Sequence, residues 1–433
     1  MKSFLLSLFI LISFISGTYA QDIKQDISGV VRDNVSGEAL IGANVILIGS
    51  NPLIGGTTNM QGKFVIESVE VGNVSLRISY IGYKTVEIYN RELRTAKALV
   101  LNVFMEEELI SGDEVVISAA TDKKASINTM TTVSARTFTI DETRRYAGSR
   151  GDVARMAANY AGVQVTSDSR NDIVIRGNSP SGLQWKLEGM EVPNPNHYGA
   201  FGTTGGPVSI INNNQLENSD FLTSAFPAEY GNAISGVFDL RLKNGNQDKH
   251  EFMAMVGFNG FELGAEGPFS KKSDASFIAN IRYSTMEIFN LIGMSFGTGA
   301  AVPKYQDFSF KLNLPTKKAG VFSVYGIGGK SSIEFLDSER DTTEVEFYGG
   351  EGWDLRNGSE MLVFGLNHII GMGKTGFIKS GLSFSNHYYY VNQDSISPDT
   401  KEIVPFYYSN FRENRVLFSS FYKKKLSKRN NFQ

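Results

Sequence analysis

The sequence predicts a mainly β chain: an N-terminal β-sandwich, an α+β domain, and then the first strands of a transmembrane antiparallel β-barrel. The 433 residues include 44 glycines, and 12% are aromatic, as in sheet-rich proteins with many tight turns. Short segments separated by Gly and Asn turns fill residues 26–106, which favours a sandwich. From residue 247 onward, long segments alternate apolar and polar residues, as the wall of a barrel does.

Composition excludes several classes of function. The formal net charge is −3, which argues against nucleic acid as a partner because phosphate binding requires a basic face. The chain has no cysteine, which excludes disulfides, thiolate zinc sites and cysteine catalysis. None of its four histidines has a metal-ligand spacing such as His-Glu-x-x-His. We therefore expect no catalytic residues, no metal site and no cofactor.

The first twenty residues indicate export. Lys2 precedes an apolar run from Phe4 to Ile15, and small residues follow up to Ala20. This pattern predicts a secretory signal peptide over residues 1–20. The alternative is a transmembrane anchor, but the run is short for about 30 Å of hydrocarbon. No later apolar stretch is long enough for a spanning helix, so insertion into a membrane would require a barrel.

Residues 26–106 contain the predicted strands of the sandwich. Val74 to Tyr80 alternates between apolar and polar residues, and Asn59 to Gly62 has the composition of a turn. We expect strands at 27–31, 43–48, 55–58, 63–66, 74–80 and 98–103.

Three motifs in this region resemble the carboxypeptidase-regulatory-like domain. They are Gly29–Asp33, the pair Gly56–Thr58 and Gly62–Phe64, and Ser79–Tyr83. The resemblance implies a small β-sandwich. It does not imply peptidase activity, because such domains are not themselves peptidases and this chain lacks the zinc-ligand spacing.

Residues 128–246 combine short helical segments with short strands. We expect helical character over 140–145 and 152–157, and strands within 162–165, 172–177, 187–193 and 228–240. Ile175-Arg176-Gly177, Glu188-Gly189-Met190 and Glu229-Tyr230-Gly231-Asn232 resemble the plug domain of TonB-dependent outer-membrane receptors of the Bacteroidetes type. In that family, polar residues of these motifs hold the plug together and tether it to the barrel. The resemblance gives structural or switching roles to Arg176, Gly177, Glu188, Gly189, Glu229, Tyr230, Gly231 and Arg241.

Residues 112–120 form a β-prone stretch with acidic and small flanking residues. On periodicity alone it is a last strand or a linker. Its place before the plug makes it resemble the TonB box, which implies capture by a TonB-like periplasmic energy-coupling protein through strand addition. The residues concerned are Asp113, Glu114, Val115, Val116, Ile117, Ser118 and Ala119.

The segment 194–202 is rich in glycine, aromatic and polar residues, which suits a binding loop. We expect candidate substrate contacts at Asn194, Asn196, His197, Tyr198 and Phe201. The alternative is a solvated loop without contacts to cargo. The glycines up to Gly206 match no phosphate-binding fingerprint, because neither Lys-Ser nor Lys-Thr follows them.

Residues 247–433 contain candidate barrel strands. Asp307 to Leu314 alternates polar and apolar residues. Short turns at 270–274, 316–320 and 372–376 alternate with longer loops near 287–304, 336–358 and 395–408, which is the layout of outer-membrane barrels. A soluble sandwich or propeller is disfavoured because no blade-like repeat occurs. We expect strands at 251–258, 259–267, 275–285, 305–314, 321–335, 359–371, 377–394 and 409–426.

The number of strands is small for a plugged barrel. The chain offers about eight strands, whereas plugged outer-membrane transporters have about 22. We therefore expect a sequence truncated within its barrel. Lys423 to Gln433 is expected to be a further periplasmic turn.

These features predict energy-coupled import across the outer membrane, with the N-terminal domain in the periplasm and outer-membrane lipid around the barrel. The sequence does not distinguish a small molecule, a glycan or a peptide as the cargo. A binding or adhesion protein without transport is the first alternative. A surface hydrolase is the second, and the sequence offers it no recognisable catalytic constellation.

Overall fold

The computed structural model describes residues 24–33, 37–95, 98–107, 135–138, 140–146, 148–257, 260–270, 273–285, 303–339, 352–373, 376–425 and 431–432. The chain divides into two compact units, Met1–Asp113 and Glu114–Gln433. The predicted signal peptide and the predicted coupling segment from Asp113 to Ala119 lie outside the described residues.

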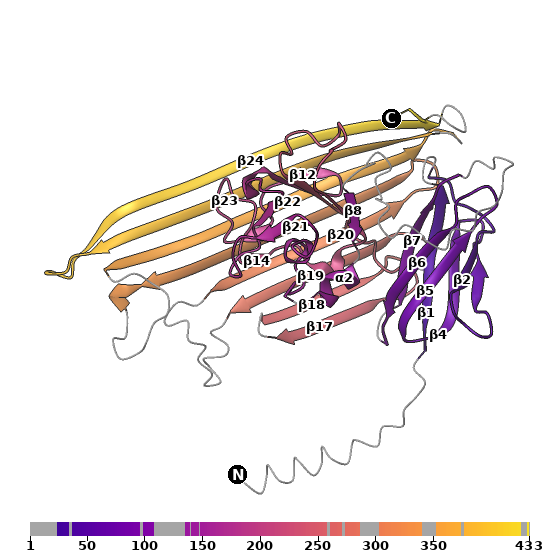
Figure 1. Cartoon of the computed structure of the whole chain (residues 1–433), viewed down its shortest axis with the longest axis horizontal. Coiled ribbons are helices and arrows are strands. Elements are labelled where there is room, and N and C mark those ends of the chain that lie inside the picture. The colour runs from indigo at the N-terminus through magenta and orange to yellow at the C-terminus, as the bar shows by residue number, and fades with distance from the viewer. Residues whose placement is uncertain are drawn as a thin grey trace, which may run out of the picture. The chain divides into compact units, whose positions relative to one another are not determined.

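The first unit is the predicted β-sandwich (Figure 1). One sheet has the order β4-β1-β7, with β1 antiparallel to β4 and parallel to β7, and the other has the order β3-β2-β5-β6. Strand β6 is absent from the expected strands because four of its eight residues are charged or amide-bearing, and no alternation continues beyond Ile88. The strands are β1 Lys24–Asp33, β2 Asn44–Leu47, β3 Gly55–Thr57, β4 Lys63–Glu70, β5 Gly72–Ser79, β6 Val86–Leu93 and β7 Leu99–Met105.

The sandwich core follows from strand alternation. Val74, Leu76 and Ile78 of β5 point inward and are buried among the apolar side chains of both sheets. At Gly29, a Cβ atom would lie 2.3 Å from the carbonyl oxygen of Leu101 and 2.7 Å from the ring of Phe64. Only glycine fits there, which explains the first glycine of the family motif.

The second unit contains the α+β domain, which we call the plug, and a large sheet, which we call the wall. The plug is built on a mixed sheet of order β12-β11-β16-β15-β8, in which β11 and β16 are parallel. Its elements are β8 Ala135–Phe138, α2 Ile140–Arg145, α3 Val153–Ala157, β9 Val163–Val165, β10 Ile173–Ile175, η1 Pro180–Gly182, β11 Leu183–Leu187, β12 Met190–Val192, β13 Asn196–His197, β14 Val208–Ser209, η2 Asn213–Gln215, β15 Ser219–Leu222 and β16 Gly236–Leu240.

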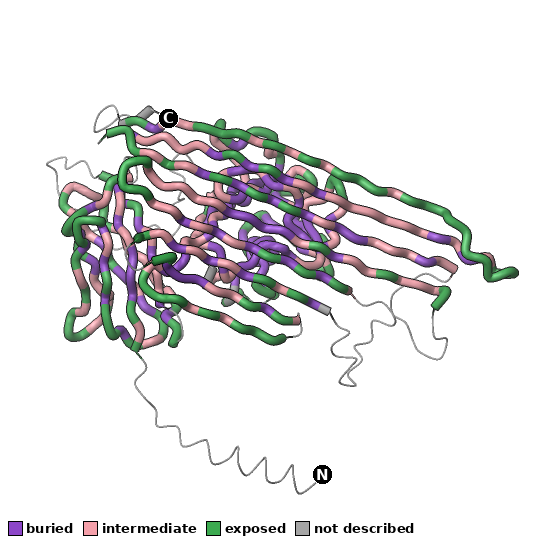
Figure 2. The backbone as a smooth tube through the Cα atoms, turned by 180° about the vertical axis from the view of Figure 1, so that it is seen from behind, coloured by how far each residue is buried: buried purple, intermediate pink, exposed green. Residues whose placement is uncertain are grey.

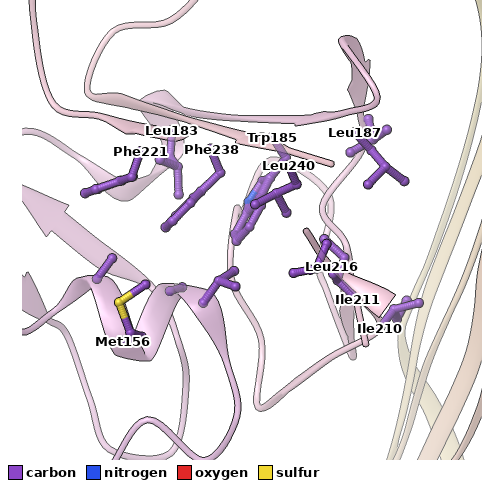
Figure 3. Close-up of a cluster of buried hydrophobic side chains, with 14 of the residues drawn as sticks. Met156, Leu183, Trp185, Leu187, Ile210, Ile211, Leu216, Phe221, Phe238 and Leu240 are labelled. Atoms are coloured by element: carbon purple, nitrogen blue, oxygen red, sulfur yellow. The ribbon is translucent and has the colours of Figure 1, made fainter. Parts of the chain in front are cut away.

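A buried aromatic stack forms the centre of the plug (Figure 3). The ring of Phe238 stacks on Trp185 with centroids 4.5 Å apart and on Phe221 with centroids 4.4 Å apart. Phe138 of β8 meets Phe238 edge-on, and Met156 of α3 is buried in the same cluster. The stack therefore joins the sheet to the helix, and the hydrophobic core around it extends to Tyr325, Ile327, Met361 and Val363 in residues 321–371.

The wall is a nine-stranded antiparallel sheet in which each strand pairs with its neighbour in sequence. Figure 1 shows plug elements such as β12, β14 and α2 against one face of it. The predicted fold class, mainly β with a sandwich, an α+β plug and antiparallel barrel strands, is confirmed. The strands are β17 Glu251–Gly257, β18 Gly260–Pro268, β19 Ser276–Thr285, β20 Lys304–Pro315, β21 Val321–Leu336, β22 Trp353–Gly371, β23 Gly376–Ile396, β24 Ile403–Lys425 and β25 Asn431–Phe432.

The longest strands extend further than the sequence predicted. Strand β22 begins at Trp353, within the expected loop 336–358, and β24 begins at Ile403, within the expected loop 395–408. The expected turn from Lys423 is also wrong in part, because β24 continues to Lys425 and pairs with β25.

The added part of β24, Ile403 to Tyr408, is apolar or aromatic on both faces and includes Pro405. In β22 the alternation of Trp353 to Arg356 is broken by Asn357 and Gly358. Ladder pairing therefore continues where the sequence pattern is interrupted.

The two faces of the wall have opposite character. Along β20 the residues that face the plug are buried and mostly polar, whereas Phe308 points away and is exposed. Figure 2 shows buried and exposed positions alternating along the wall strands. The buried residues of β20 are Tyr305, Asp307, Ser309, Lys311 and Asn313.

Apolar side chains form a belt on the outer face. The belt lies across β21 to β24 in consecutive rows, namely Gly326, Phe364, Phe384 and Val416, and then Val324, Leu366, Leu382 and Phe418.

Further along the strands the outer face becomes polar. On β22 the belt ends at Leu362. The next row on the outer face, which includes Glu360 of β22, consists of Lys330, Glu360, Tyr388 and Arg412. Lys330 pairs with Glu360 at 2.8 Å, and the Arg412 guanidinium lies over the Tyr388 ring. An apolar band bordered by aromatic and charged residues is the outer surface expected of a barrel wall in lipid.

None of the helices in the described part of the chain combines the length and the apolarity needed to cross a membrane.

Phe364→Arg is expected to destabilise the wall in lipid by about 2–4 kcal/mol, because it places a cation within the apolar belt. Asn410→Arg is the matched control, since Asn410 lies on the same face beyond the belt, and it should cost about 0–1 kcal/mol. Urea titration of the chain in phosphatidylcholine vesicles measures both. Equal effects would mean that the belt does not face lipid.

Candidate functional site

The plug is held on the inner face of the wall by polar contacts and by an apolar contact, in which Tyr325, Ile327, Met361 and Val363 of the wall join the core of the plug. Asp307 of β20 lies at the centre of the polar contacts and is fully buried. Its carboxylate accepts hydrogen bonds from the guanidinium of Arg282 in β19 at 2.7 to 3.0 Å. On its plug side, Nε2 of His197 lies 2.8 Å from the same carboxylate. Arg282 also donates to the carbonyl oxygen of Ser209 at 2.6 Å, so wall and plug share one charged cluster.

The electrostatics of this cluster favour a neutral histidine. Burial lowers the pKa of His197, and this effect exceeds the opposing influence of the Asp307 carboxylate. Arg282 already balances the charge of Asp307, so a second cation is not required. The arrangement makes Nε2 of His197 the donor to Asp307.

The turn at Glu188 and Gly189 forms a second contact with the wall. Both residues have positive φ, 55° and 87°, so a tight turn projects from the plug sheet. The Glu188 carboxylate accepts from Nζ of Lys311 at 3.0 Å and from the backbone N–H of Leu242 at 2.7 Å. Nδ2 of Asn367 donates to the Glu188 carbonyl oxygen at 3.0 Å.

An amide–carboxylate cluster forms a third contact. Oε1 of the wall residue Glu262 accepts hydrogen bonds at 2.8 to 2.9 Å from the amides of plug residues Asn212 and Asn214 and of wall residue Asn280. Toward the last strands, Arg415 of β24 donates to Glu191 of β12 at 2.5 Å. The plug is thus held by hydrogen bonds and ion pairs that span most of the wall.

The predicted substrate loop is itself docked on the wall. The backbone N–H of Tyr198 donates to Oγ of Ser331 at 2.9 Å, and the Tyr198 hydroxyl donates to the carbonyl oxygen of Lys304 at 2.9 Å. The ring of Phe201 stacks on Phe411 of β24, with centroids 5.2 Å apart and an interplanar angle of 8°.

The side chains of this loop divide into two groups. Asn194, Asn196 and His197 are buried at 8%, 1% and 0% exposure, so in this structure they bind the plug and the wall instead of facing outward. Phe201 is half-exposed, and Tyr198 is partly exposed. Sequence reasoning placed all five residues in one outward loop, and only the fold separates them.

The predicted switch residues lie at several places. Glu188 and Gly189 meet the wall, and close to them the carboxylates of Asp239, Asp220, Glu217 and Glu188 hold the pKa of Arg241 above its usual value against the effect of burial. The remaining residues lie elsewhere in the plug.

The motif Glu229-Tyr230-Gly231-Asn232 is organised around Tyr230. Its hydroxyl donates to the Asp239 carboxylate at 2.9 Å, and Nζ of Lys186 lies over its ring. Gly231 accepts from Nε2 of Gln184 through its carbonyl oxygen, and Glu229 is exposed. Arg176 and Gly177 are exposed in a positive-φ turn after β10.

The wall partners of the plug were missed by sequence reasoning. Asp307, Lys311 and Glu262 are charged residues at the polar positions of alternating strands. Charges within barrel strands at inward positions are a usable signal, because such residues require partners once the interior is filled.

Residues 27–117 match the family model of the CarboxypepD_reg-like domain, which confirms the predicted carboxypeptidase-regulatory-like domain. No curated protein matches the sequence.

Several solved structures resemble the chain. The siderophore receptor PirA from Acinetobacter baumannii matches with a TM-score of 0.45 and 16% identity, over 67% of this chain and 45% of that chain. The ferric enterobactin receptor PfeA from Pseudomonas aeruginosa matches with a TM-score of 0.42 and 15% identity, over 65% of this chain and 45% of that chain. The ferric-catecholate import receptor Fiu from E. coli K12 matches with a TM-score of 0.45 and 10% identity, over 68% of this chain and 46% of that chain. The chain spans less than half the length of these receptors.

Asp307→Ala is expected to destabilise the docked plug by about 3–5 kcal/mol, because the Arg282 guanidinium loses its carboxylate inside the protein. Asp399→Ala, at an exposed aspartate, should change stability by less than about 0.5 kcal/mol. Denaturant unfolding in detergent micelles, followed through the fluorescence of the plug residue Trp185, measures the difference. Similar small effects for both variants would contradict a central role for Asp307.

Proposed function

We propose that the chain is part of a TonB-dependent receptor that imports a substrate across the outer membrane with energy supplied from the periplasm. The observation that carries the proposal is a plug docked, largely by hydrogen bonds and ion pairs, on the inner face of a wall whose outer face carries an apolar belt. The motifs Ile175–Gly177, Glu188–Met190 and Glu229–Asn232, which resemble the plug of these receptors, belong to that plug. The role of the protein is transport, and we assign it no catalytic step.

The chemistry of the docking contacts suits a plug that moves. Ion pairs and hydrogen bonds, such as those from Lys311 to Glu188 and from Asn212 to Glu262, can be exchanged for bonds to water. The apolar contact of the plug with Tyr325, Ile327, Met361 and Val363 would be exposed on opening and opposes that movement. The aromatic stack of Trp185, Phe221 and Phe238 lies within the plug and would stay together if the polar contacts with the wall were exchanged.

Energy enters through the segment from Asp113 to Ala119 in this proposal. An extended peptide can add as a strand to a sheet edge of the periplasmic energy-coupling protein. The described chain resumes at β8, which is an edge strand of the plug sheet. A pull on the preceding residues therefore acts first on β8, whose pairing with β15 is its link to the rest of the sheet.

Cargo contact is assigned to the loop that contains Tyr198 and Phe201. The stacked rings of Phe201 and Phe411 are each about half-exposed, with fractions of 49% and 51%, and offer aromatic surface at the junction of plug and wall. A small molecule, a glycan or a peptide can each use such a surface. Displacement of this loop by cargo would disturb the neighbouring contact of His197 with Asp307.

Val116→Pro is expected to abolish binding of the periplasmic domain of a TonB-like protein, because proline removes the backbone N–H and resists strand pairing. Val116→Ala is the matched control, since it shortens the side chain but keeps the N–H, and it should retain most of the binding. Surface plasmon resonance with the purified full chain in detergent and the immobilised periplasmic domain measures both. No binding by the unmodified chain would favour an outer-membrane binding or adhesion protein without transport.

A further inference from the structure

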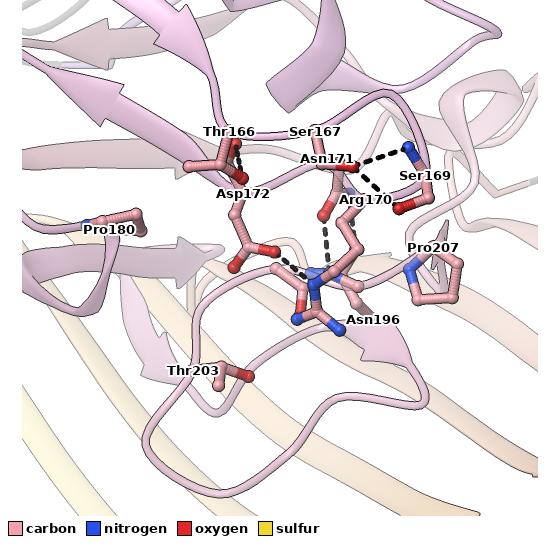
Figure 4. A network of polar contacts seen from close by, with 12 residues as sticks. Thr166, Ser167, Ser169, Arg170, Asn171, Asp172, Pro180, Asn196, Thr203 and Pro207 are labelled. Atoms are coloured by element: carbon pink, nitrogen blue, oxygen red, sulfur yellow. Dashed lines mark hydrogen bonds and ion pairs between the residues drawn. The ribbon is translucent and has the colours of Figure 1, made fainter. Parts of the chain in front are cut away.

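Helix α3 is joined to the loop 194–206 by a chain of hydrogen-bonded side chains inside the plug. Asp152, the residue that caps α3, accepts from Nδ2 of Asn171 at 2.7 Å. The same Nδ2 donates to Oδ1 of Asn196 at 2.7 Å, and Nδ2 of Asn196 donates to Oδ1 of Asn194 at 2.7 Å. Nδ2 of Asn194 then reaches Oγ1 of Thr203 at 3.1 Å. Figure 4 shows Asn171, Asn196 and Thr203 within the surrounding network.

This series of side-chain hydrogen bonds has a fixed donor-to-acceptor direction because one end is a carboxylate. Asp152 has only acceptor oxygens when ionised, so Asn171 must present its amide nitrogen to it. The second hydrogen of that nitrogen goes to Asn196, which in turn must present its nitrogen to Asn194. The orientation of each amide thus follows from the group before it.

Four of the five hydrogen-bonded side chains are buried, and only Thr203 at the end is partly exposed. Asn171 and Asn196 are each 1% exposed, and Asp152 and Asn194 are also buried. Asn171 is further fixed because its Oδ1 accepts the backbone N–H of Gly206 at 2.7 Å. A buried polar group that loses its partner in such a place leaves an unsatisfied neighbour, so the links are formed or broken together.

The two ends of the chain lie in different parts of the plug. At one end, Oδ1 of Asp152 accepts the backbone N–H groups of Ala154 and Arg155, which fixes the start of α3. At the other end lies the loop that carries Phe201 and contacts the wall. Asp152 and Asn194 are far apart in sequence, and among the described residues no backbone–backbone hydrogen bond joins α3 to this loop.

We infer that Asn171 is a positioning residue that holds the loop 194–206 in register with α3, so that movement of the loop is transmitted to the helix. The inference rests on the proposed function in one respect: the proposed function assigns this loop to cargo, which gives the coupling a biological role. Its physical content is a coupling between two segments, and coupling of this kind must act in both directions.

Hydrogen exchange of the full chain in detergent micelles, followed by mass spectrometry, tests the coupling without a cargo. Asn171→Ala should raise exchange in the loop 194–206 by about tenfold or more, because buried hydrogen bonds are lost. Asn194→Ala should raise exchange in α3, which it does not touch. Strands β20 to β23 serve as an internal reference and should stay unchanged.

Two further variants separate coupling from a local role in the helix. Asp152→Ser keeps a capping oxygen for α3 but is too short to reach Asn171, so it should raise exchange in the loop and leave α3 protected. Asn159→Ala is the matched control, because Asn159 contacts only the backbone of α3 through Nδ2, and its effect should stay within the helix.

An unchanged loop in both Asn171→Ala and Asp152→Ser would overturn the inference. An equal rise in the wall strands would do so as well, since it would indicate a general loss of stability. Neither outcome depends on binding of the energy-coupling protein, so this inference and the proposed function can fail separately.

Discussion

The two-residue period of the wall strands is the constraint on which the second unit depends. Each strand residue points either away from the plug or toward it, so one alternating sequence serves two different environments. Along β20 this places Phe308 outside and Asp307 inside on adjacent positions. The apolar belt and the polar docking surface are therefore products of the same register, and a slip of one residue would exchange them.

Charge inside the wall is balanced by partners from both sides of the contact. Asp307 lies between the wall residue Arg282 and the plug residue His197, and Glu188 of the plug lies against Lys311 of the wall. A charged group buried without such a partner would be costly, so plug and wall depend on each other for stability. Beside these polar contacts, Tyr325, Ile327, Met361 and Val363 of the wall pack against the core of the plug and add an apolar contribution to docking.

Within the plug, apolar and polar parts have separate tasks. The stack of Trp185, Phe221 and Phe238 supplies the core and holds the sheet together. The chain from Asp152 through Asn171 to the loop 194–206 supplies no hydrophobic stability, but it fixes where the loop lies relative to α3. The proposed cargo recognition and energy coupling would use both properties, a domain that stays folded and a loop held in a defined position.

Sequence by itself determined the fold class, most strand positions and the carboxypeptidase-regulatory-like domain, because these depend on local periodicity and on short motifs. It failed at β6 and at the extended parts of β22 and β24, where the residues do not keep a continuous alternation of apolar and polar side chains. Only the tertiary structure decided which polar residues of the plug meet the wall. His197 and Asp307 are 110 positions apart, and no local pattern connects them. It also buried Asn194, Asn196 and His197 while leaving Phe201 half-exposed, because burial depends on what packs against a loop and not on the loop's own composition.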